Sequence, residues 1–217
     1  IYRQIMDACK KIQGVAVAFQ GEIGAYSEEA AFRFFSTLLQ GLPYESLEEV
    51  FLSVEAGEAP FGILPIENST EGSINRVYDL MLDSILMVCG EIELRVSHCL
   101  IARPEDSLET IKKVYSHPQA LAQCRNFLMR NKLEARPYYD TAGAAKMLAR
   151  ENPRAAAAIA SSLCAELYDL EIIKEGIEDG PSNSTRFLLL AREPHPDDGD
   201  KTSIIFAVPH EAGRLYA

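Results

Sequence analysis

Short apolar runs alternate with longer segments of helical periodicity from residue 15 to residue 191, and this alternation restricts the fold more than any other feature of the sequence. Each run is short and continuously apolar, which is typical of a buried strand. We interpret as strands residues 15–19, 61–66, 113–115, 136–139, 155–160, 171–177 and 187–191. Strands that alternate with helices predict parallel sheets built from β-α units.

The segments between these runs predict helices, because apolar residues recur on one face of each. These helices cover residues 28–39, 47–56, 74–82, 120–131 and 142–150, the residues from the Ser161-Ser162 turn to Leu167, and a shorter stretch capped by Ser107. A longer apolar stretch, residues 85–102, predicts one or two extended strands that cross into a second lobe. The return of the chain near Leu170 then places a cleft between two lobes.

Polar side chains follow most of the predicted strands, at the point where each strand ends. One polar turn alone is most simply a solvated helix cap, but several at one edge of a sheet indicate a site. Ligands of parallel α/β sheets bind outside the carboxyl ends of the strands, where helix N-termini also point. The turns contain Tyr26, Ser27, Asn68, Ser69, Thr70, Ser116, His117, Gln119, Thr141 and Ser161. Hydroxyls, amides and helix N-termini together suit a carboxylate ligand.

The stretch from Asn183 to Phe187 joins a turn rich in Gly, Pro, Ser and Asn to the last predicted strand. Turn chemistry breaks the chain before Thr185 and Arg186, and the buried strand begins at Phe187. The hydroxyl of Thr185 and the guanidinium of Arg186 are therefore expected at the mouth of a rigid element. Polar groups held by a packed scaffold are what a binding or catalytic site requires.

Charge and composition exclude several classes of function. The 217 residues carry a formal net charge of -11, which argues against nucleic acid and anionic membranes as partners. Five cysteines without a C-x-x-C pair indicate buried free thiols, and four histidines without ligand spacing argue against a metal site. We find neither a signal peptide nor an apolar run long enough to span a bilayer. A cytoplasmic location is the resulting expectation.

Five stretches of the chain, read in order, resemble the prephenate dehydratase family. They are residues 18–31 (AFQGEIGAYSEEAA), 62–75 (GILPIENSTEGSIN), 115–119 (YSHPQ), 140–142 (DTA) and 183–187 (NSTRF). No single stretch is specific, but the five in this order are. The resemblance covers most of residues 15–190 and implies the decarboxylating dehydration of prephenate to phenylpyruvate, on the route to phenylalanine.

The resemblance implies an α/β fold of two lobes, like that of periplasmic binding proteins, with the site between the lobes. Lobe 1 is expected to cover residues 15–92 and 168–192, and lobe 2 residues 93–167. Residues 1–14 resemble a linker helix at the end of the chorismate mutase domain of bifunctional members. Residues 193–217 resemble a linker and the start of an ACT domain, so a phenylalanine effector is expected only if that domain is complete. The family also suggests a homodimer.

The resemblance also implies roles for individual residues. Thr185 would give a proton or a strong hydrogen bond to the departing hydroxide, Arg186 would clamp the pyruvyl carboxylate, and Phe187 would pack beside the ring. The other substrate-binding residues expected are Asn68, Ser69, Thr70, Gly72, Thr141, Ala142, Tyr26, Ser27, Ser116, His117, Gln119 and Ser184. His117 has an equally good interpretation as a turn residue before Pro118. No step of this reaction needs a metal or an organic cofactor.

Two alternatives stay open at this point. The same chemistry on arogenate, which carries an amino group, would be favoured by an acidic partner near the side chain, and Glu67 or Glu71 could serve. A non-catalytic carboxylate-binding module is the other alternative, and Thr185 discriminates against it. The chain also departs from the family pattern at Glu22-Ile23, where many relatives carry Pro and a small or polar residue, and at Ala25, where Thr or Ser is common.

Overall fold

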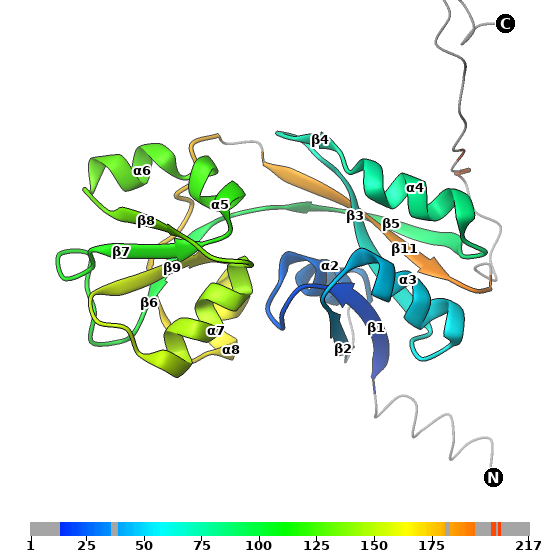
Figure 1. Cartoon of the computed structure of the whole chain (residues 1–217), viewed down its shortest axis with the longest axis horizontal. Helices are drawn as coiled ribbons and strands as arrows, with labels where there is room; N and C mark the ends of the chain where they lie inside the picture. The colour runs from blue at the N-terminus through cyan, green and yellow to red at the C-terminus, as the bar shows by residue number, and fades with distance from the viewer. Residues whose placement is uncertain (1–13, 36–38, 181–182, 194–200, 203, 205–217) are drawn as a thin grey trace, which may run out of the picture.

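Two α/β lobes lie side by side along the long axis of the molecule (Figure 1). The computed structural model describes residues 14–35, 39–180, 183–193, 201–202 and 204. The chain crosses from lobe 1 to lobe 2 between β5 (Met87–Arg95) and β6 (Cys99–Ala102). It returns between β10 (Glu171–Lys174) and β11 (Ser184–Ala191). The two-lobed α/β architecture predicted from the sequence is confirmed.

Lobe 1 contains a mixed sheet with the strand order β2-β1-β3-β11-β5, in which β4 pairs with β3. The elements not yet defined are β1 (Val15–Gln20), β2 (Leu39–Tyr44), β3 (Phe61–Asn68), β4 (Gly72–Ser73), α2 (Tyr26–Phe35), α3 (Leu47–Ala56) and α4 (Asn75–Asp83). Side chains alternate between the two faces of β11, so Phe187 and Leu189 pack on the α2 side, and Leu188 and Leu190 on the α3 and α4 side.

Lobe 2 contains a second mixed sheet, with the order β10-β6-β9-β7-β8. Its other elements are β7 (Lys113–Ser116), β8 (Glu134–Pro137), β9 (Ala156–Ala160), α5 (Pro118–Gln123), α6 (Arg125–Arg130), α7 (Thr141–Glu151) and α8 (Ser162–Leu167). Strands β7, β8 and β9 are mutually parallel, as β1, β2 and β3 are in lobe 1. The predicted β-α units account for these strands.

The predicted parallel pairing does not extend to the strands that connect the lobes. β11 runs antiparallel to both β3 and β5, and β6 runs antiparallel to both β9 and β10. The chain leaves lobe 1 along β5 and returns to it along β11, so these two strands run in opposite directions. They therefore cannot both be parallel to the other strands of the sheet. No local pattern in the sequence records that constraint.

The expected lobe boundaries also need correction. β10, which we expected in lobe 1 within residues 168–192, pairs with β6 in lobe 2. Residues 93–95, expected in lobe 2, are the end of β5 in lobe 1. The linker helix expected over residues 1–14 and the ACT-like segment expected over residues 193–217 lie almost wholly outside the described residues.

Strand β2 follows the first predicted helix and was missed from the sequence. Gly41 and Pro43 make the segment an unpromising strand, but β2 is an edge strand, where proline is tolerated. A Cβ at Gly41 would lie 2.3 Å from a carboxylate oxygen of Glu28. The glycine therefore allows β2 to approach α2 closely.

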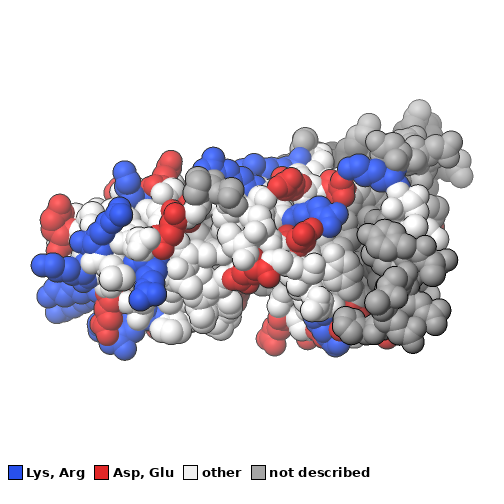
Figure 2. Space-filling model, turned by 90° about the horizontal axis from the view of Figure 1, so that it is seen from above, with Lys and Arg blue, Asp and Glu red and all other residues white. Residues whose placement is uncertain are grey.

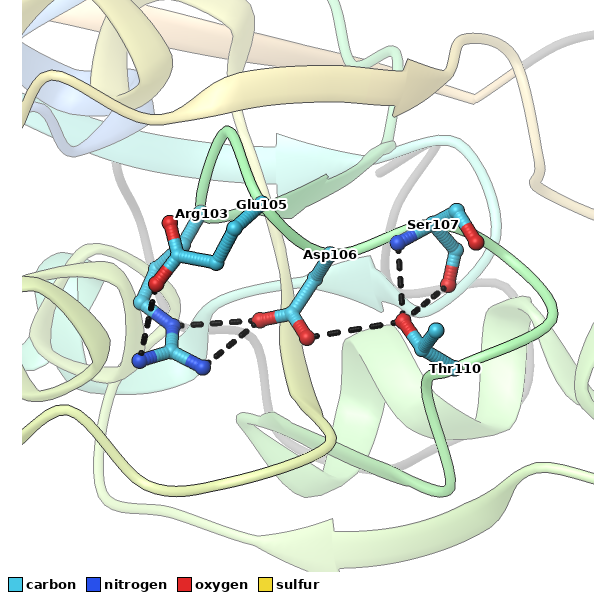
Figure 3. A network of polar contacts seen from close by, with 5 residues as sticks. All are labelled: Arg103, Glu105, Asp106, Ser107 and Thr110. Atoms are coloured by element: carbon cyan, nitrogen blue, oxygen red, sulfur yellow. Dashed lines mark hydrogen bonds and ion pairs between the residues drawn. The ribbon is translucent and has the colours of Figure 1, made fainter.

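Two helix predictions differ from the structure in lobe 2. The helix expected over residues 120–131 is divided at Cys124 into α5 and α6. Ser107 caps no helix, and the hydroxyl of Thr110 instead bonds to the backbone of Ser107 within the loop (Figure 3). The N–H of Ser107 donates to the hydroxyl of Thr110 at 2.9 Å, and that hydroxyl also contacts Asp106, which pairs with Arg103.

The loop between β1 and α2 fastens lobe 1 to lobe 2. The carbonyl of Gly24 accepts from Ser161 Oγ at 2.9 Å, and the carbonyl of Ile23 accepts from the Tyr168 hydroxyl at 2.7 Å. Apolar side chains of both lobes continue this contact as one buried cluster. These contacts set the relative position of the two cavity walls. None of the helices in the described ranges is long and apolar enough to span a bilayer.

Candidate active site

A cavity of about 870 Å³ lies between the lobes, at the ends of β1, β3 and β11 in lobe 1 and of β7 in lobe 2. Nine of the residues expected at a substrate site line it: Tyr26, Ser27, Asn68, Gly72, His117, Gln119, Thr141, Thr185 and Phe187. They come from segments far apart in the sequence and from both lobes. The structure thus brings these nine residues together at one cleft.

Thr185 lies within strand β11 rather than in the turn before it. Its side chain is 8% exposed and lines the cavity together with Phe187. The hydroxyl oxygen of Thr185 accepts a hydrogen bond from Nδ2 of Asn68 at 2.9 Å. Its own hydrogen makes no bond within the described residues and is available to a ligand. Accepting a hydrogen bond polarises the O–H group and makes it a better donor.

Arg186 does not reach the cavity, contrary to the expectation that it clamps a carboxylate. Its side chain is absent from the cavity wall and pairs with Glu67 at 3.0 Å and Glu91 at 3.7 Å. The physical reason is the alternation of side chains along a strand, which directs Arg186 away from the face that Thr185 and Phe187 share.

Five other expected residues are also outside the cavity wall. Ser116 is fully buried, and its hydroxyl donates to the carbonyl of Ile159 at 2.6 Å. Ala142 is fully buried in the first turn of α7. Both positions therefore contribute to packing rather than to ligand contact.

The hydroxyls of the remaining three make hydrogen bonds to neighbours in lobe 1, and that of Thr70 also accepts from Gln123 in lobe 2. The oxygen of Ser69 accepts from the N–H of Ser184 at 2.9 Å, and the hydroxyl of Ser184 donates to Glu93 at 2.6 Å. Thr70 donates to Oδ1 of Asn68 at 2.5 Å. These contacts fix the turn after β3 against the start of β11, which holds Asn68 in place.

His117 lines the cavity and also caps α5. Its Nδ1 accepts from the N–H of Gln119 at 3.3 Å, so the interpretation as a turn residue is correct without excluding contact with a ligand. Asp140 has a similar double position: it accepts from the N–H of Gly143 at 2.7 Å, which begins α7, and it lines the cavity. Burial raises the pKa of Asp140, and the backbone N–H groups only partly offset this.

The cavity wall also contains three residues for which the sequence predicted no role: Gln123, His98 and Asn183. Gln123 lies four residues after Gln119 on α5, and this spacing on one helix face is the signal that could have found it. Asn183 stands in a quoted motif but was given no role. No sequence signal indicates His98.

His98 is a buried residue whose ring links Tyr26 to Gln123. The Tyr26 hydroxyl lies 2.9 Å from both Nδ1 of His98 and the carbonyl oxygen of Ser97, so these two acceptors share its single hydrogen. Nε2 of His98 lies 2.8 Å from Oε1 of Gln123, an oxygen that can only accept, so Nε2 carries the hydrogen. Burial lowers the pKa of His98 and keeps the ring neutral.

Acidic side chains line the cavity, whereas no Lys or Arg among the described residues does so. The acidic residues are Glu22, Glu45, Glu71 and Asp140. Glu22 is neutralised across the lobes by Lys146 at 2.5 Å. On the face that Figure 2 shows, Lys and Arg are densest at the end of lobe 2 away from lobe 1. An anionic ligand would therefore be held by uncharged donors and by the N-termini of α2 and α7.

The described residues contain no group of three or more His, Cys, Asp or Glu side chains that could hold a metal ion. The uncharged part of the wall can supply hydrogen-bond donation from hydroxyl and amide groups. Such groups stabilise negative charge on a ligand or on a leaving group when they are held in place beforehand.

Comparison with known proteins identifies related sequences over most of the chain. Residues 17–195 match the family described as prephenate dehydratase. The chain is 48% identical to arogenate dehydratase 3 of Arabidopsis thaliana, over 91% of this chain and 47% of that protein. It is 39% identical to the bifunctional chorismate mutase/prephenate dehydratase of Pseudomonas aeruginosa, over 100% of this chain and 60% of that protein.

A solved structure of a quorum quenching acylase, GqqA, superposes with a TM-score of 0.78 and 32% identity, over 93% of this chain and 74% of that one. The chain thus spans about half to three fifths of the length of the curated relatives it matches.

Proposed function

The chain belongs to the prephenate dehydratase family, and we propose that it catalyses the loss of carbon dioxide and hydroxide from prephenate to give phenylpyruvate. The observation that carries this proposal is the Thr185 hydroxyl, which lines the cavity between the lobes, accepts from Asn68, and keeps its own hydrogen for a ligand.

The reaction needs help mainly at the leaving group. Loss of the ring carboxylate as carbon dioxide supplies the electron pair that makes the ring aromatic and expels the hydroxyl. Hydroxide is a poor leaving group, so a proton or strong hydrogen bond to it lowers the barrier, typically by about 10²–10⁴-fold in rate. Thr185 is a weak acid, and it acts here as a polarised donor or as a relay for a proton.

Acylase activity, for which GqqA is named, fits this geometry less well if Thr185 is taken as the nucleophile. A threonine nucleophile needs a general base that accepts its hydrogen. The partner of the Thr185 hydroxyl is the amide nitrogen of Asn68, which donates and has no proton-accepting capacity. The contact therefore favours a threonine that donates over one that attacks.

Arogenate is a second candidate substrate, and the position of Glu71 in the cavity wall favours it. Glu71 lines the cavity, whereas Glu67 is paired with Arg186 outside it. A carboxylate in the wall would pair with the amino group of arogenate. The Glu71→Gln variant is expected to lose activity on arogenate relative to prephenate, and an unchanged ratio of kcat/KM values would remove Glu71 from substrate selection.

We extend the proposal to the whole protein as expected from the family: a homodimer in the cytoplasm, with phenylalanine acting through an ACT domain. The greater length of the curated relatives is compatible with further domains. Light scattering of the full-length protein, with and without phenylalanine, tests the oligomeric state and the effector together.

The decisive experiment mixes the purified protein with prephenate and follows the absorbance of phenylpyruvate in alkali. Product formation that Thr185→Val abolishes and Thr185→Ser retains is the expected result. Binding of prephenate without product would instead favour the non-catalytic module, and turnover by Thr185→Val equal to that of the wild type would end the assignment of Thr185.

A further inference from the structure

Four side chains close a ring of hydrogen bonds beside Thr185, and the ring crosses between the lobes. Nδ2 of Asn68 donates to Oδ1 of Asn183 at 3.0 Å, and Nδ2 of Asn183 donates to Oε1 of Gln123 at 3.0 Å. Nε2 of Gln123 donates to the hydroxyl oxygen of Thr70 at 3.2 Å, and that hydroxyl donates to Oδ1 of Asn68. Gln123 is the last residue of α5 in lobe 2, whereas the others belong to lobe 1.

The backbone sets the direction of these bonds. The N–H groups of Thr70 and Glu71 donate to Oδ1 of Asn68 at 3.0 and 3.2 Å, and an N–H group can only donate. The oxygen of Asn68 is therefore the acceptor, so Thr70 must give it its hydroxyl hydrogen. Thr70 must then accept from Gln123, which directs the Gln123 nitrogen toward Thr70.

The ring uses its acceptors and leaves three donors unused. Oε1 of Gln123 accepts from both Asn183 and His98. Each of the amides of Gln123 and Asn183 has two N–H hydrogens and gives one to the ring. The Thr185 hydroxyl accepts from Asn68 and keeps its hydrogen. Within the described residues, Gln123, Asn183 and Thr185 make no other side-chain donations.

These three residues line the same cavity, which has acidic but no basic side chains in its described wall. A wall that presents hydrogens while its oxygens are engaged suits an anion, and a carboxylate gains most from such donors. We propose that Gln123 and Asn183 bind a carboxylate of the substrate through their unused N–H groups, near Thr185. The proposal takes the identity of the substrate from the proposed function and assigns to two neutral amides the clamp expected of Arg186.

The division of donors between the lobes fits the shape of prephenate. Its hydroxyl and its two carboxyl-bearing groups are at opposite ends of a six-membered ring, so the donors for the two ends must be separated. Thr185 belongs to lobe 1 and Gln123 to lobe 2, with Asn183 between them. The carbonyl of Gln123 also accepts from the N–H of Asp179 at 2.7 Å, which fixes the end of α5.

Binding of phenylpyruvate, the carboxylate product, tests this assignment without requiring turnover. Isothermal titration compares phenylpyruvate with its uncharged methyl ester on the wild type, Gln123→Met and Asn183→Leu. Each of the two variants loses a hydrogen bond to a charged group, so its affinity for phenylpyruvate should fall about 10- to 100-fold. The affinity for the ester should change little, and KM for prephenate should rise more than kcat falls.

Thr70→Val is the matched control, because Thr70 is in the ring but its hydrogen is already used inside it. This variant breaks the ring at Thr70 but removes no unused donor, so it should lose less affinity for phenylpyruvate than Gln123→Met does. An equal loss of affinity in Thr70→Val and Gln123→Met would show that an intact ring, rather than its free donors, is needed, and would overturn the proposal. Gln123→Glu tests the charge of the ligand group directly. Because its carboxylate repels an anion, this variant should bind phenylpyruvate more weakly than Gln123→Met does. The two variants should bind the uncharged ester about equally.

The outcomes separate this inference from the proposed function. A wild type that binds phenylpyruvate but forms none from prephenate would contradict the dehydratase proposal and leave the carboxylate site standing. Turnover by the wild type, with unchanged affinity in Gln123→Met and Asn183→Leu, would refute the carboxylate site alone. If thermal unfolding shows that Gln123→Met does not fold, Asn183→Leu decides the question.

Discussion

Two hydroxyls at strand ends, Thr185 on β11 and Ser116 on β7, look equivalent in the sequence and differ completely in the structure. Both stand in polar motifs where a strand meets a turn. Ser116 is fully buried and gives its hydrogen to the carbonyl of Ile159. Thr185 lines the cavity, accepts from Asn68, and keeps its hydrogen.

This difference shows that the direction of a hydroxyl's hydrogen bond, and not its place in a motif, decides whether it can act on a ligand. A hydroxyl whose hydrogen is used by the backbone stabilises the fold. A hydroxyl that only accepts from the protein still has a hydrogen to offer. The comparison can be tested by removing each hydroxyl and the groups that orient it.

The largest effect is expected for Thr185→Val, which keeps the shape and removes the donor. Since the leaving group would lose its hydrogen bond, kcat for prephenate should fall about 10²–10⁴-fold. Steady-state kinetics with a melting curve measures this, and the melting temperature should stay close to that of the wild type. A large loss of stability without loss of kcat would show that Thr185, like Ser116, has only a structural role.

Asn68→Asp should have the next largest effect. The substituted carboxylate cannot donate to Thr185 and would accept its hydrogen instead, so the threonine would no longer serve the ligand. Breaking the bond between Thr185 and the new carboxylate costs as much as a hydrogen bond to a charged group, so kcat should fall about 10- to 100-fold. The control is Asn68→Asp combined with Thr185→Val, which should be no slower than Thr185→Val alone.

Ser116→Ala should affect stability rather than rate. Loss of the buried bond to the carbonyl of Ile159 should cost about 1–3 kcal/mol in the free energy of unfolding. Urea denaturation measures that change, while kcat and KM for prephenate are expected to stay at the wild-type values. A fall in kcat at unchanged stability would return Ser116 to the list of ligand contacts.

Arg186→Ala should have the smallest effect. Its ion pairs with Glu67 and Glu91 are exposed, so their loss should cost less than about 1 kcal/mol of stability. Because Arg186 is outside the cavity wall, KM for prephenate should not change. A KM increase as large as that of Gln123→Met would show that the guanidinium reaches the ligand when it binds.

Much of the fold was predictable because each strand and helix has its own local pattern. The limits of α3 were predicted without error, since Ser46 and Glu49 form a capping box and Gly57 ends the helix in a left-handed conformation. Strand β2 was missed because its glycine and proline are unfavourable in strands, and only its pairing with β1 makes it a strand. The antiparallel direction of β11 also depends on a distant partner.

The site was predictable where one strand end carries the residue into the cavity, as for Asn68 and Thr141. It was not predictable where the outcome depends on which face of an element is turned inward, as for Arg186, or on the approach of the other lobe, as for Gln123 and His98. Each of these residues has a partner more than 20 residues away in the chain, and short-range patterns carry no information about such partners.

The order of residues along the chain was sufficient to establish the alternation of strands and helices and the family, and to single out Thr185 as a candidate donor. Tertiary contacts determined which polar groups face the cavity and in which direction each hydrogen bond runs. The reason is that periodicity is set by neighbours in sequence, whereas hydrogen-bond direction is set by groups that meet only after the two lobes have packed together.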